Sequence, residues 1–153
     1  GGDAEVVRIA ALLHDVGKCR VPEEILSKPG KLTEEEYAQV QCHARASWEV
    51  LSRVRPPLSR TVLDIVLHHH EALDGTGYPD GLVGEAIPRP TQMMTVCDVY
   101  AALIECRSYR PPLPSAQALA ILRAMAQSGR VEAEDVERLS VAVARIGARE
   151  TSH

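Results

Sequence analysis

Apolar residues along this chain recur mainly at spacings of three and four, and no segment keeps a sustained alternation of apolar and polar residues between turns. Spacings of three and four place apolar side chains on one face of an α-helix. The pattern therefore predicts an all-α protein, a bundle of about six to seven helices.

The strongest helical signal is residues 4–15, which are apolar at nearly every position and predict a central helix buried on most of its sides. Thr33 and Glu36 form a capping-box pattern, so a helix is expected from residue 33 to about residue 54, before two prolines. Further helices are expected over residues 58–71, 91–105, 115–128 (with Ser115 as N-cap) and 132–149, with a short helical turn at 23–26.

Two segments predict loops. Residues 73–90 are rich in glycine and proline and contain two Asp-Gly pairs, which favour turns. A loop of this length inside a compact domain is usually functional or disordered. A second loop is expected over residues 107–114.

Composition narrows the class of protein. A chain of 153 residues predicts one domain, over residues 1–153. Its net charge of −4 argues against binding of a nucleic-acid polymer. The sequence lacks a long uncharged apolar run and a secretory signal pattern, so we expect no membrane span and a cytoplasmic protein. The four cysteines have no C-x-x-C spacing and are expected to be reduced thiols.

Candidate chemistry begins at His14 and Asp15, an imidazole and a carboxylate side by side at the end of an apolar segment. A carboxylate in such surroundings is costly unless a cation holds it, and imidazole with carboxylate is a ligand pair for divalent metals. His43, His69, His70 and Asp98 extend this pair to a set that a buried metal centre explains and an ordinary core does not.

A helical wheel assigns directions to the histidine run. At about 100° per residue, His69 and His70 share the face of the neighbouring apolar residues, whereas His68 points outward. His43 lies on the flank of an apolar stripe, and Asp98 lies inside an apolar helix. The two oxygens of Asp15 are separate donors, which makes this carboxylate the natural bridge between two ions.

The donor types favour iron, manganese, zinc or nickel over calcium or magnesium. Lys18 lies three residues after Asp15, so its ammonium group is expected near the centre.

Taken in order, these residues resemble the HD-GYP branch of the HD-domain phosphohydrolases. The motifs are His14-Asp15, Lys18, His43, His69-His70-Glu71, Asp74-Gly75-Thr76-Gly77-Tyr78-Pro79 and Asp98. The resemblance covers roughly residues 6–128. It implies an all-helical fold and hydrolysis of the bacterial second messenger cyclic di-GMP to pGpG or GMP. It also implies two divalent metal ions. Iron and manganese are the expected metals, and zinc and nickel are the alternatives.

The resemblance also implies roles. Asp15 would bridge the two metals, one of which would take His14 and Asp98 and the other His43, His69 and His70. Asp15 and Lys18 would be the catalytic residues. Substrate contacts would come from Lys18, Arg107, Arg110 and Tyr78. The loop residues Asp74, Gly75, Gly77, Tyr78 and Pro79 would shape the mouth of the site and offer a docking surface for a partner protein.

Two departures leave alternatives open. Ala101 stands where the family has a carboxylate, and no residue before His14 matches the ligand that the family supplies from upstream helices, so the domain is expected to lack those helices and a third metal. A catalytically weak or inactive domain that binds a ligand or a partner is therefore an alternative, and a hydrolase for another nucleotide is a second. The resemblance further suggests an upstream sensory domain, and the apolar stripe of the last helix suits packing within the domain or a homodimer.

Overall fold

The protein is represented by a computed structural model, which describes residues 2–106 and 111–150 and the side chains of residues 4–106 and 111–147. The α-helices in these ranges are α1 (Gly2–Leu13), α2 (Glu23–Leu26), α3 (Glu34–Gln41), α4 (His43–Leu51), α5 (Arg60–His68), α6 (Arg89–Ile104), α7 (Ser115–Gln127) and α8 (Ala133–Glu150). Two 3₁₀ helices are η1 (Val16–Arg20) and η2 (Gly84–Ala86).

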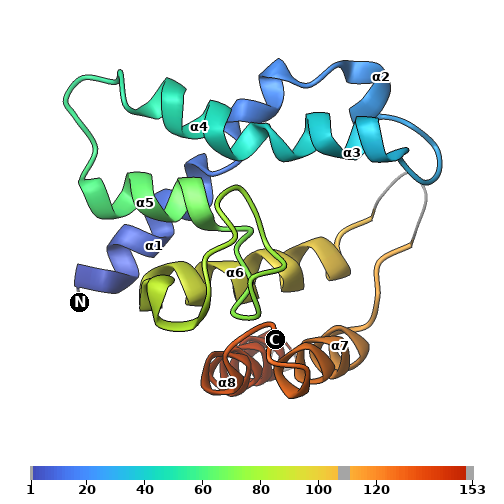
Figure 1. The fold of residues 1–153 in the computed structure, drawn as a ribbon. Coiled ribbons are helices and arrows are strands. Elements are labelled where there is room, and N and C mark those ends of the chain that lie inside the picture. The colour runs from blue at the N-terminus through green and yellow to red at the C-terminus, as the bar shows by residue number, and fades with distance from the viewer. Residues whose placement is uncertain (1, 107–110, 151–153) are drawn as a thin grey trace.

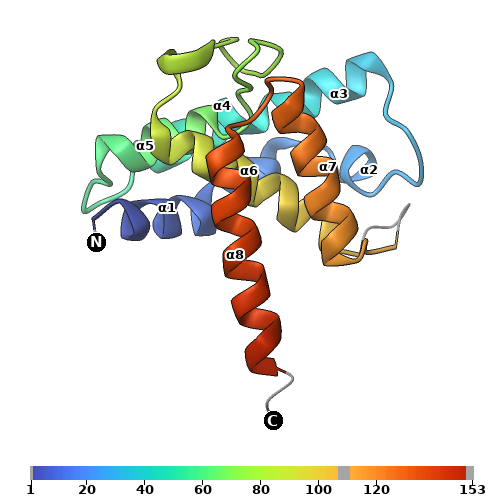
Figure 2. The same ribbon diagram turned by 90° about the horizontal axis from the view of Figure 1, so that it is seen from below.

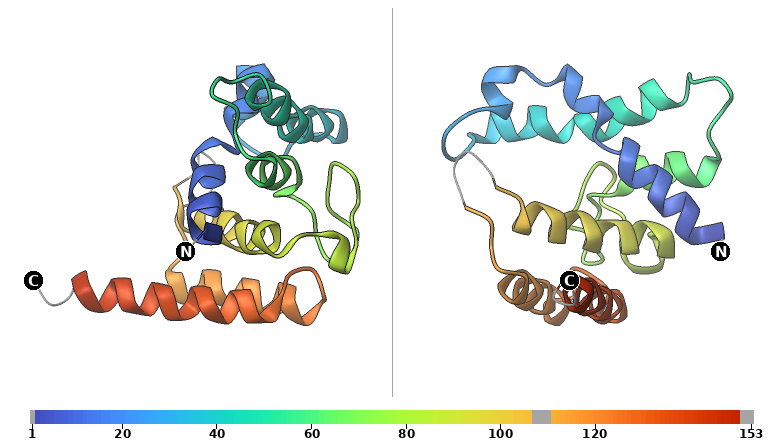
Figure 3. Two further views of the ribbon diagram at one scale, coloured as in Figure 1. Left: turned by 90° about the vertical axis from the view of Figure 1, so that its left-hand side faces the viewer. Right: turned by 180° about the vertical axis from the view of Figure 1, so that it is seen from behind.

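The all-α prediction is confirmed for the part of the chain that the structure describes, where the single antiparallel bridge is isolated and joins Asp74 to Val83. The helices form layers (Figures 1 and 3). Helices α2, α3 and α4 lie at one side, α1, α5 and α6 form the middle, and α7 and α8 pack as a pair against α6.

Helix α6 separates two apolar cores. The first core lies between α1, α5, α6 and the end of α4 and contains Ala10, Leu51, Val62, Ile65, Val66 and Met94. The second core lies between α6, α7 and α8 and contains Val96, Tyr100, Ala118, Leu119, Leu122, Val131 and Val136. Because α6 is covered on both sides, its sequence is apolar nearly all round, as the pattern indicated.

Two predicted boundaries are wrong. The helix expected over 33–54 is two helices, and Cys42 lies between them with its thiol donating to the carbonyl of Ala38 at 3.3 Å. Its capping box is confirmed, because Thr33 accepts from the amide of Glu36 and the Glu36 carboxylate accepts from the amide of Thr33. Ser115 is the first residue of α7 and its side chain caps nothing; Pro114 holds the N-cap position.

Helix α1 differs from its prediction as well. Ala10 is fully buried against α5 and α6, but Leu12 is 74% exposed. The helix is therefore buried on one side and open on the other, although its sequence is apolar on both. Among the described helices, none is long and apolar enough to span a bilayer.

Candidate metal centre

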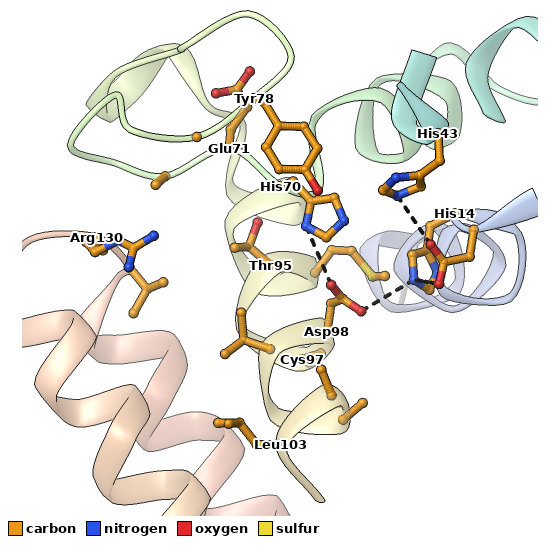
Figure 4. A pocket seen from close by; sticks show the side chains of 18 of the residues that line it. His14, His43, His70, Glu71, Tyr78, Thr95, Cys97, Asp98, Leu103 and Arg130 are labelled. Carbon is orange, nitrogen blue, oxygen red and sulfur yellow. Dashed lines mark ion pairs between the residues drawn. The ribbon is translucent and has the colours of Figure 1, made fainter. Parts of the chain in front are cut away.

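The structure brings the six predicted ligands together from four parts of the chain, and Figure 4 labels four of them, His14, His43, His70 and Asp98. His14 and Asp15 follow the last turn of α1, His43 begins α4, His69 and His70 follow α5, and Asp98 lies on α6. A sequence span of 85 positions thus converges on one point between helices.

The turn that carries His14 and Asp15 is fixed by a buried serine that the sequence did not single out. The Ser47 hydroxyl donates to the carbonyl of His14 at 2.6 Å and accepts from the amide of Gly17 at 2.8 Å. A Cβ on Gly17 would lie 2.2 Å from the carbonyl oxygen of His43. Glycine at this position therefore allows η1 and α4 to approach closely enough to bring His14, Asp15 and His43 together.

Three of the imidazoles are oriented in the same way. The Nδ1 atoms of His14, His43 and His69 each lie at hydrogen-bond distance from a backbone carbonyl three residues earlier, at 2.9, 2.6 and 2.7 Å. Nδ1 is therefore the protonated nitrogen when these rings are neutral, and Nε2 carries the lone pair. All three Nε2 atoms face the centre, which is the arrangement of metal-ligating histidines whose other nitrogen is held by the protein.

A divalent cation fits the contacts that result. The Nε2 atoms of His43 and His69 are 3.4 Å apart with no proton to share between them when both rings are neutral. Burial lowers the pKa of both rings, which favours this neutral form. The buried Oδ1 of Asp15 lies 3.3 Å from Nε2 of His43 and has no hydrogen-bond donor among the described residues. Facing lone pairs and an unpaired carboxylate oxygen are costly without a cation between them.

Each of the two carboxylates faces two histidines. Asp15 Oδ2 lies 3.3 Å from His14 Nε2, while its Oδ1 faces His43. Asp98 Oδ1 lies 3.4 Å from His14 Nε2, and its Oδ2 lies 3.8 Å from His70 Nδ1. Both carboxylates therefore lie between ligand groups, whereas only Asp15 was expected to do so.

Two sets of residues each have ligand atoms that all lie within 4.8 Å of one another. One set is His43, His69 and His70, and the other is His14, Asp15 and His69. His69 belongs to both, since its buried ring lies between the other histidines, with centroids 4.8 Å from His14 and 4.0 Å from His70. The hydroxyl of Thr95 donates to the carbonyl of His69 at 2.9 Å and ties this position to α6.

The charges of the centre are strongly coupled. Burial opposes protonation of His14, but its contacts with Asp15 and Asp98 outweigh burial and raise the pKa of this imidazole to about 10. The same contact with His14, together with Lys18, holds the pKa of Asp15 well below its usual range despite burial. Burial and the neighbouring imidazoles lower the pKa of His69 and of His70 to about 3.

Comparison with known proteins agrees with this geometry, since the HD domain family matches residues 3–134 of the chain. The chain belongs to the HD domain family. Three curated relatives show how similar it is to known members. It is 43% identical, over 84% of this chain, to the cyclic di-GMP phosphodiesterase response regulator RpfG of Xanthomonas campestris pv. campestris. It is 46% identical, over 72% of this chain, to the cyclic di-GMP phosphodiesterase PA4108 of Pseudomonas aeruginosa. It is 45% identical, over 76% of this chain, to 3'3'-cGAMP-specific phosphodiesterase 3 of Vibrio cholerae.

The matched part of each relative is small, because this HD domain covers 34, 27 and 25% of their respective lengths. Among solved structures, Bd1817, an HDG"Y"P protein from Bdellovibrio bacteriovorus, shares the fold with a TM-score of 0.71 at 21% identity. That match covers 90% of this chain and 43% of the other. The relatives and the fold together confirm the resemblance to the HD-GYP branch.

The centre of this HD domain opens into a cleft of about 770 Å³. Lys18 lines it and donates to Asp15 Oδ2 at 2.6 Å, as its position in the sequence indicated. The ring of Tyr78 stacks at a tilt on His70, with centroids 4.7 Å apart, which puts this loop residue directly against the centre (Figure 4). Tyr37 and Arg130 also line the cleft, and neither was singled out from the sequence.

The loop of residues 72–83 is organised by a buried carboxylate. Glu71 accepts backbone hydrogen bonds from Asp80 at 2.7 Å, Gly81 at 3.1 Å and Leu82 at 3.0 Å. A Cβ on Gly77 would lie 2.3 Å from the amide nitrogen of Ala72, so only glycine lets the loop fold back on itself here. Of the predicted loop residues, Gly77 and Tyr78 line the cleft, whereas Asp74, Gly75 and Pro79 are not among its lining residues.

His68 belongs to neither donor set, as its outward position on the wheel predicted. Its Nε2 atom lies 3.0 Å from Oδ2 of Asp80, a loop carboxylate that Arg45 also contacts. The wheel placed His68 relative to its own helix and carried no information about the loop that returns beside it.

The other two predicted substrate contacts, Arg107 and Arg110, lie outside the described residues. Ala101 lines the cleft. All four cysteines are free thiols, as expected, and burial raises the pKa of the Cys97 thiol, which keeps it protonated.

Proposed function

We propose that this domain is a metal-dependent phosphodiesterase that hydrolyses a cyclic dinucleotide, and that cyclic di-GMP is its preferred substrate. The observation that carries the proposal is the convergence of His14, Asp15, His43, His69, His70 and Asp98. Within this set the Nε2 atoms of His43 and His69 face one another, and Nε2 of His43 also faces the unpaired buried Oδ1 of Asp15.

In this proposal the six residues would hold two divalent ions. Iron and manganese are the preferred metals, and zinc and nickel are the alternatives. His14, Asp15 and Asp98 belong to one ion, and His43, His69 and His70 to the other, with Asp15 shared. Bound ions would supply Lewis acidity to the phosphodiester and to the attacking water. The protein supplies the orientation, because backbone carbonyls hold the three Nδ1 atoms and thereby aim the Nε2 lone pairs.

Lys18 is the second catalytic residue of the proposal. Its ammonium lies beside Asp15 and is partly exposed in the cleft, so it reaches a phosphate oxygen at the centre with little change of position. A charge-assisted hydrogen bond from Lys18 would stabilise the negative charge that develops on the phosphoryl group. The ring of Tyr78 lies against His70 and forms one wall of the cleft beside the centre.

The substrate class rests on the relatives, whose names specify cyclic di-GMP or 3'3'-cGAMP. A cleft of about 770 Å³ is within the range of small-molecule sites and suits a ligand of this size. Some of the relatives are named for cyclic di-GMP and others for 3'3'-cGAMP, so an experiment has to distinguish between these two substrates.

The test is a turnover assay of protein loaded with Mn²⁺ or, under anaerobic conditions, Fe²⁺, with cyclic di-GMP and 3'3'-cGAMP as separate substrates. We expect release of the linear dinucleotide or of mononucleotides from at least one of them, and loss of this product with Asp15→Ala. Equal product from both proteins would contradict the proposal. Metal analysis of the anaerobically purified protein reports the identity and number of the ions independently of turnover.

A ligand-binding domain with little or no turnover is the second candidate. Ala101 favours it, because an alanine lines the cleft where the HD-GYP pattern has a carboxylate. In that case the metal-loaded protein would bind the cyclic dinucleotide, and product would not exceed the Asp15→Ala control. An Ala101→Asp variant that gains turnover would identify the missing carboxylate as the cause.

A further inference from the structure

Aromatic residues are scarce in this chain, and two of them meet at the cleft. The sequence contains four tyrosines, one tryptophan and no phenylalanine. Tyr37 and Tyr78 approach edge to face, with ring centroids 6.4 Å apart and an angle of 84° between the rings. Tyr78 contacts His70 in turn, so Tyr37 is two ring contacts away from the metal centre.

Tyr37 is also unusually open for an aromatic residue in ring contact. It is 50% exposed and lines the cleft, so part of its ring surface is available to a ligand there. Tyr37 is therefore not a core residue, in contrast to Tyr100 of the second core, which is only 9% exposed.

The backbone under Tyr37 is held in place. It lies on α3, whose start is fixed by the Thr33–Glu36 capping box, and the carboxylate of Glu36 also accepts two hydrogen bonds from Lys28, at 2.8 and 2.6 Å. The amide of Tyr37 donates to the carbonyl of Thr33 at 2.9 Å. A ring on a fixed helix loses little freedom when a planar ligand stacks on it.

We propose that Tyr37 is a nucleobase-stacking residue, which holds one purine of the cyclic dinucleotide while the adjacent phosphodiester lies at the metal centre. The inference rests on the proposed function and adds a position for the base. In a nucleotide the ribose separates base from phosphate, so a phosphate held near Lys18 directs the base outward, toward a wall such as the one that Tyr78 and Tyr37 form. Aromatic rings stack bases without reading their edges.

The inference makes a specific statement about selectivity. Guanine and adenine both offer a flat π-face. Loss of the Tyr37 ring is therefore expected to weaken the binding of cyclic di-GMP and of 3'3'-cGAMP by a similar factor. Discrimination between the two then belongs to other residues of the cleft.

The binding test uses Mn²⁺-loaded protein and a hydrolysis-resistant phosphorothioate cyclic dinucleotide that carries 2-aminopurine, whose fluorescence falls when the base stacks. Tyr37→Leu removes the ring and keeps an apolar side chain, Tyr37→Phe keeps the ring, and Gln39→Ala changes an exposed residue of the same helix that does not line the cleft. We expect quenching with wild type, Tyr37→Phe and Gln39→Ala. With Tyr37→Leu we expect weak quenching and a Kd about tenfold higher.

Steady-state kinetics separate stacking from a structural role. Stacking predicts that Tyr37→Leu raises KM about tenfold with kcat within about twofold. Unchanged KM and unchanged quenching in Tyr37→Leu would overturn the inference and leave the proposed function standing. Quenching by wild type without turnover would overturn the enzyme proposal and leave the stacking position standing.

A third variant covers the case in which Tyr37→Leu does not fold. Tyr37→Trp keeps a stacking ring and reports on it directly. We expect its added tryptophan emission to fall on titration with unlabelled cyclic di-GMP, relative to the wild-type signal of Trp48. Emission that does not respond at ligand concentrations that saturate the wild type would overturn the inference.

Discussion

The two cores on either side of α6 are built from different kinds of contact. The core between α6, α7 and α8 is an apolar cluster, and a buried carboxylate beside it, Asp135 of α8, pairs with Arg89 of α6 at 3.0 Å. The core between α1, α5 and α6 adjoins a cluster of four imidazoles and two carboxylates, with an unpaired oxygen on Asp15. Figure 2 shows the same division in shape, with the long α8 extending past the body that surrounds the centre. Apolar packing and an Arg89–Asp135 ion pair hold one half of the molecule, whereas the other half gathers imidazoles and carboxylates whose contacts become favourable with a cation.

The largest expected effect tests whether the cation belongs to one half alone. Asp15→Asn keeps the shape of the side chain and removes its charge, so we expect at least about a hundredfold lower kcat/KM, since an ion contributes several kcal/mol to the transition state. We also expect loss of the rise in Tm that Mn²⁺ gives the wild type, measured by thermal denaturation. Glu137→Gln, which removes an exposed carboxylate that pairs with Arg123 between α7 and α8, is the control and is expected to change neither. A Tm rise of wild-type size in Asp15→Asn would place the ion elsewhere.

The second prediction reverses the comparison. Leu122 is fully buried in the core of α7 and α8, so Leu122→Ala is expected to lower the free energy of unfolding by about 3 kcal/mol through lost burial and a cavity. At a temperature where the variant is folded, metal affinity and KM are expected to stay within about twofold of wild type. Chemical denaturation and metal titration measure the two quantities. Ile121→Ala, which is the neighbouring and 40% exposed position, is the matched control with a smaller loss. A parallel loss of metal affinity would show that the halves are coupled.

The third prediction compares two glycines. Gly77→Ala brings a Cβ to 2.3 Å from the amide nitrogen of Ala72, so the loop must shift and carry Tyr78 off His70. We expect a loss of about 2 kcal/mol of stability and about tenfold of kcat/KM. Gly147→Ala on α8 meets no atom within 4 Å and is expected to stabilise by about 0.5–1 kcal/mol, because alanine favours a helix. Identical effects of the two variants would contradict the close approach at Gly77.

The last prediction concerns the pH dependence of the stability of the metal-free protein. The pKa of His69 and His70 is about 3 when folded, against 6.5 for an ordinary histidine, so the unfolded chain binds more protons between these values. Stability is therefore expected to fall as the pH is lowered from about 6.5 toward 3, by about 1.4 kcal/mol per pH unit for each of the two histidines. His14 acts in the opposite direction: with its pKa raised to about 10, its contribution is complete below 6.5 and is lost as the pH rises toward 10.

Denaturation at a series of pH values checks both limbs. Leu122→Ala is expected to keep the same slope at lower absolute stability, since the titrating groups lie on the other side of α6. A flat profile below pH 6.5 would mean that the histidines are protonated in the folded protein.

Single residues show how far local pattern reaches. Asp98 and His43 were predictable because a polar side chain on an apolar helix face is costly to bury without a partner, and its position on that face can be seen in the sequence. His69 and His70 were predicted to face inward and do so, although α5 ends at His68. The partner of His68 was not predicted, because Asp80 comes from a loop twelve residues further on.

Ser47 and Arg130 left no comparable signal, and Glu71 was noted only as part of the HD-GYP motif, without a role. The carboxylate of Glu71 holds the amides of a returning loop, and Ser47 joins α4 to the turn after α1. Arg130 reaches the cleft because the turn between α7 and α8 lies beside α6. A common residue type becomes informative in these positions only when a distant backbone is brought next to it.

The sequence by itself determined the helical class, most helix positions, the six ligand candidates and the family, because helical periodicity and the cost of burying charge are local properties of the chain. Only the tertiary structure decided that His69 lies between both donor sets, that the two carboxylates each face two imidazoles, and that Tyr37 meets Tyr78 at the cleft. Those facts depend on the packing of helices far apart in sequence, which sets directions and distances that no local spacing contains.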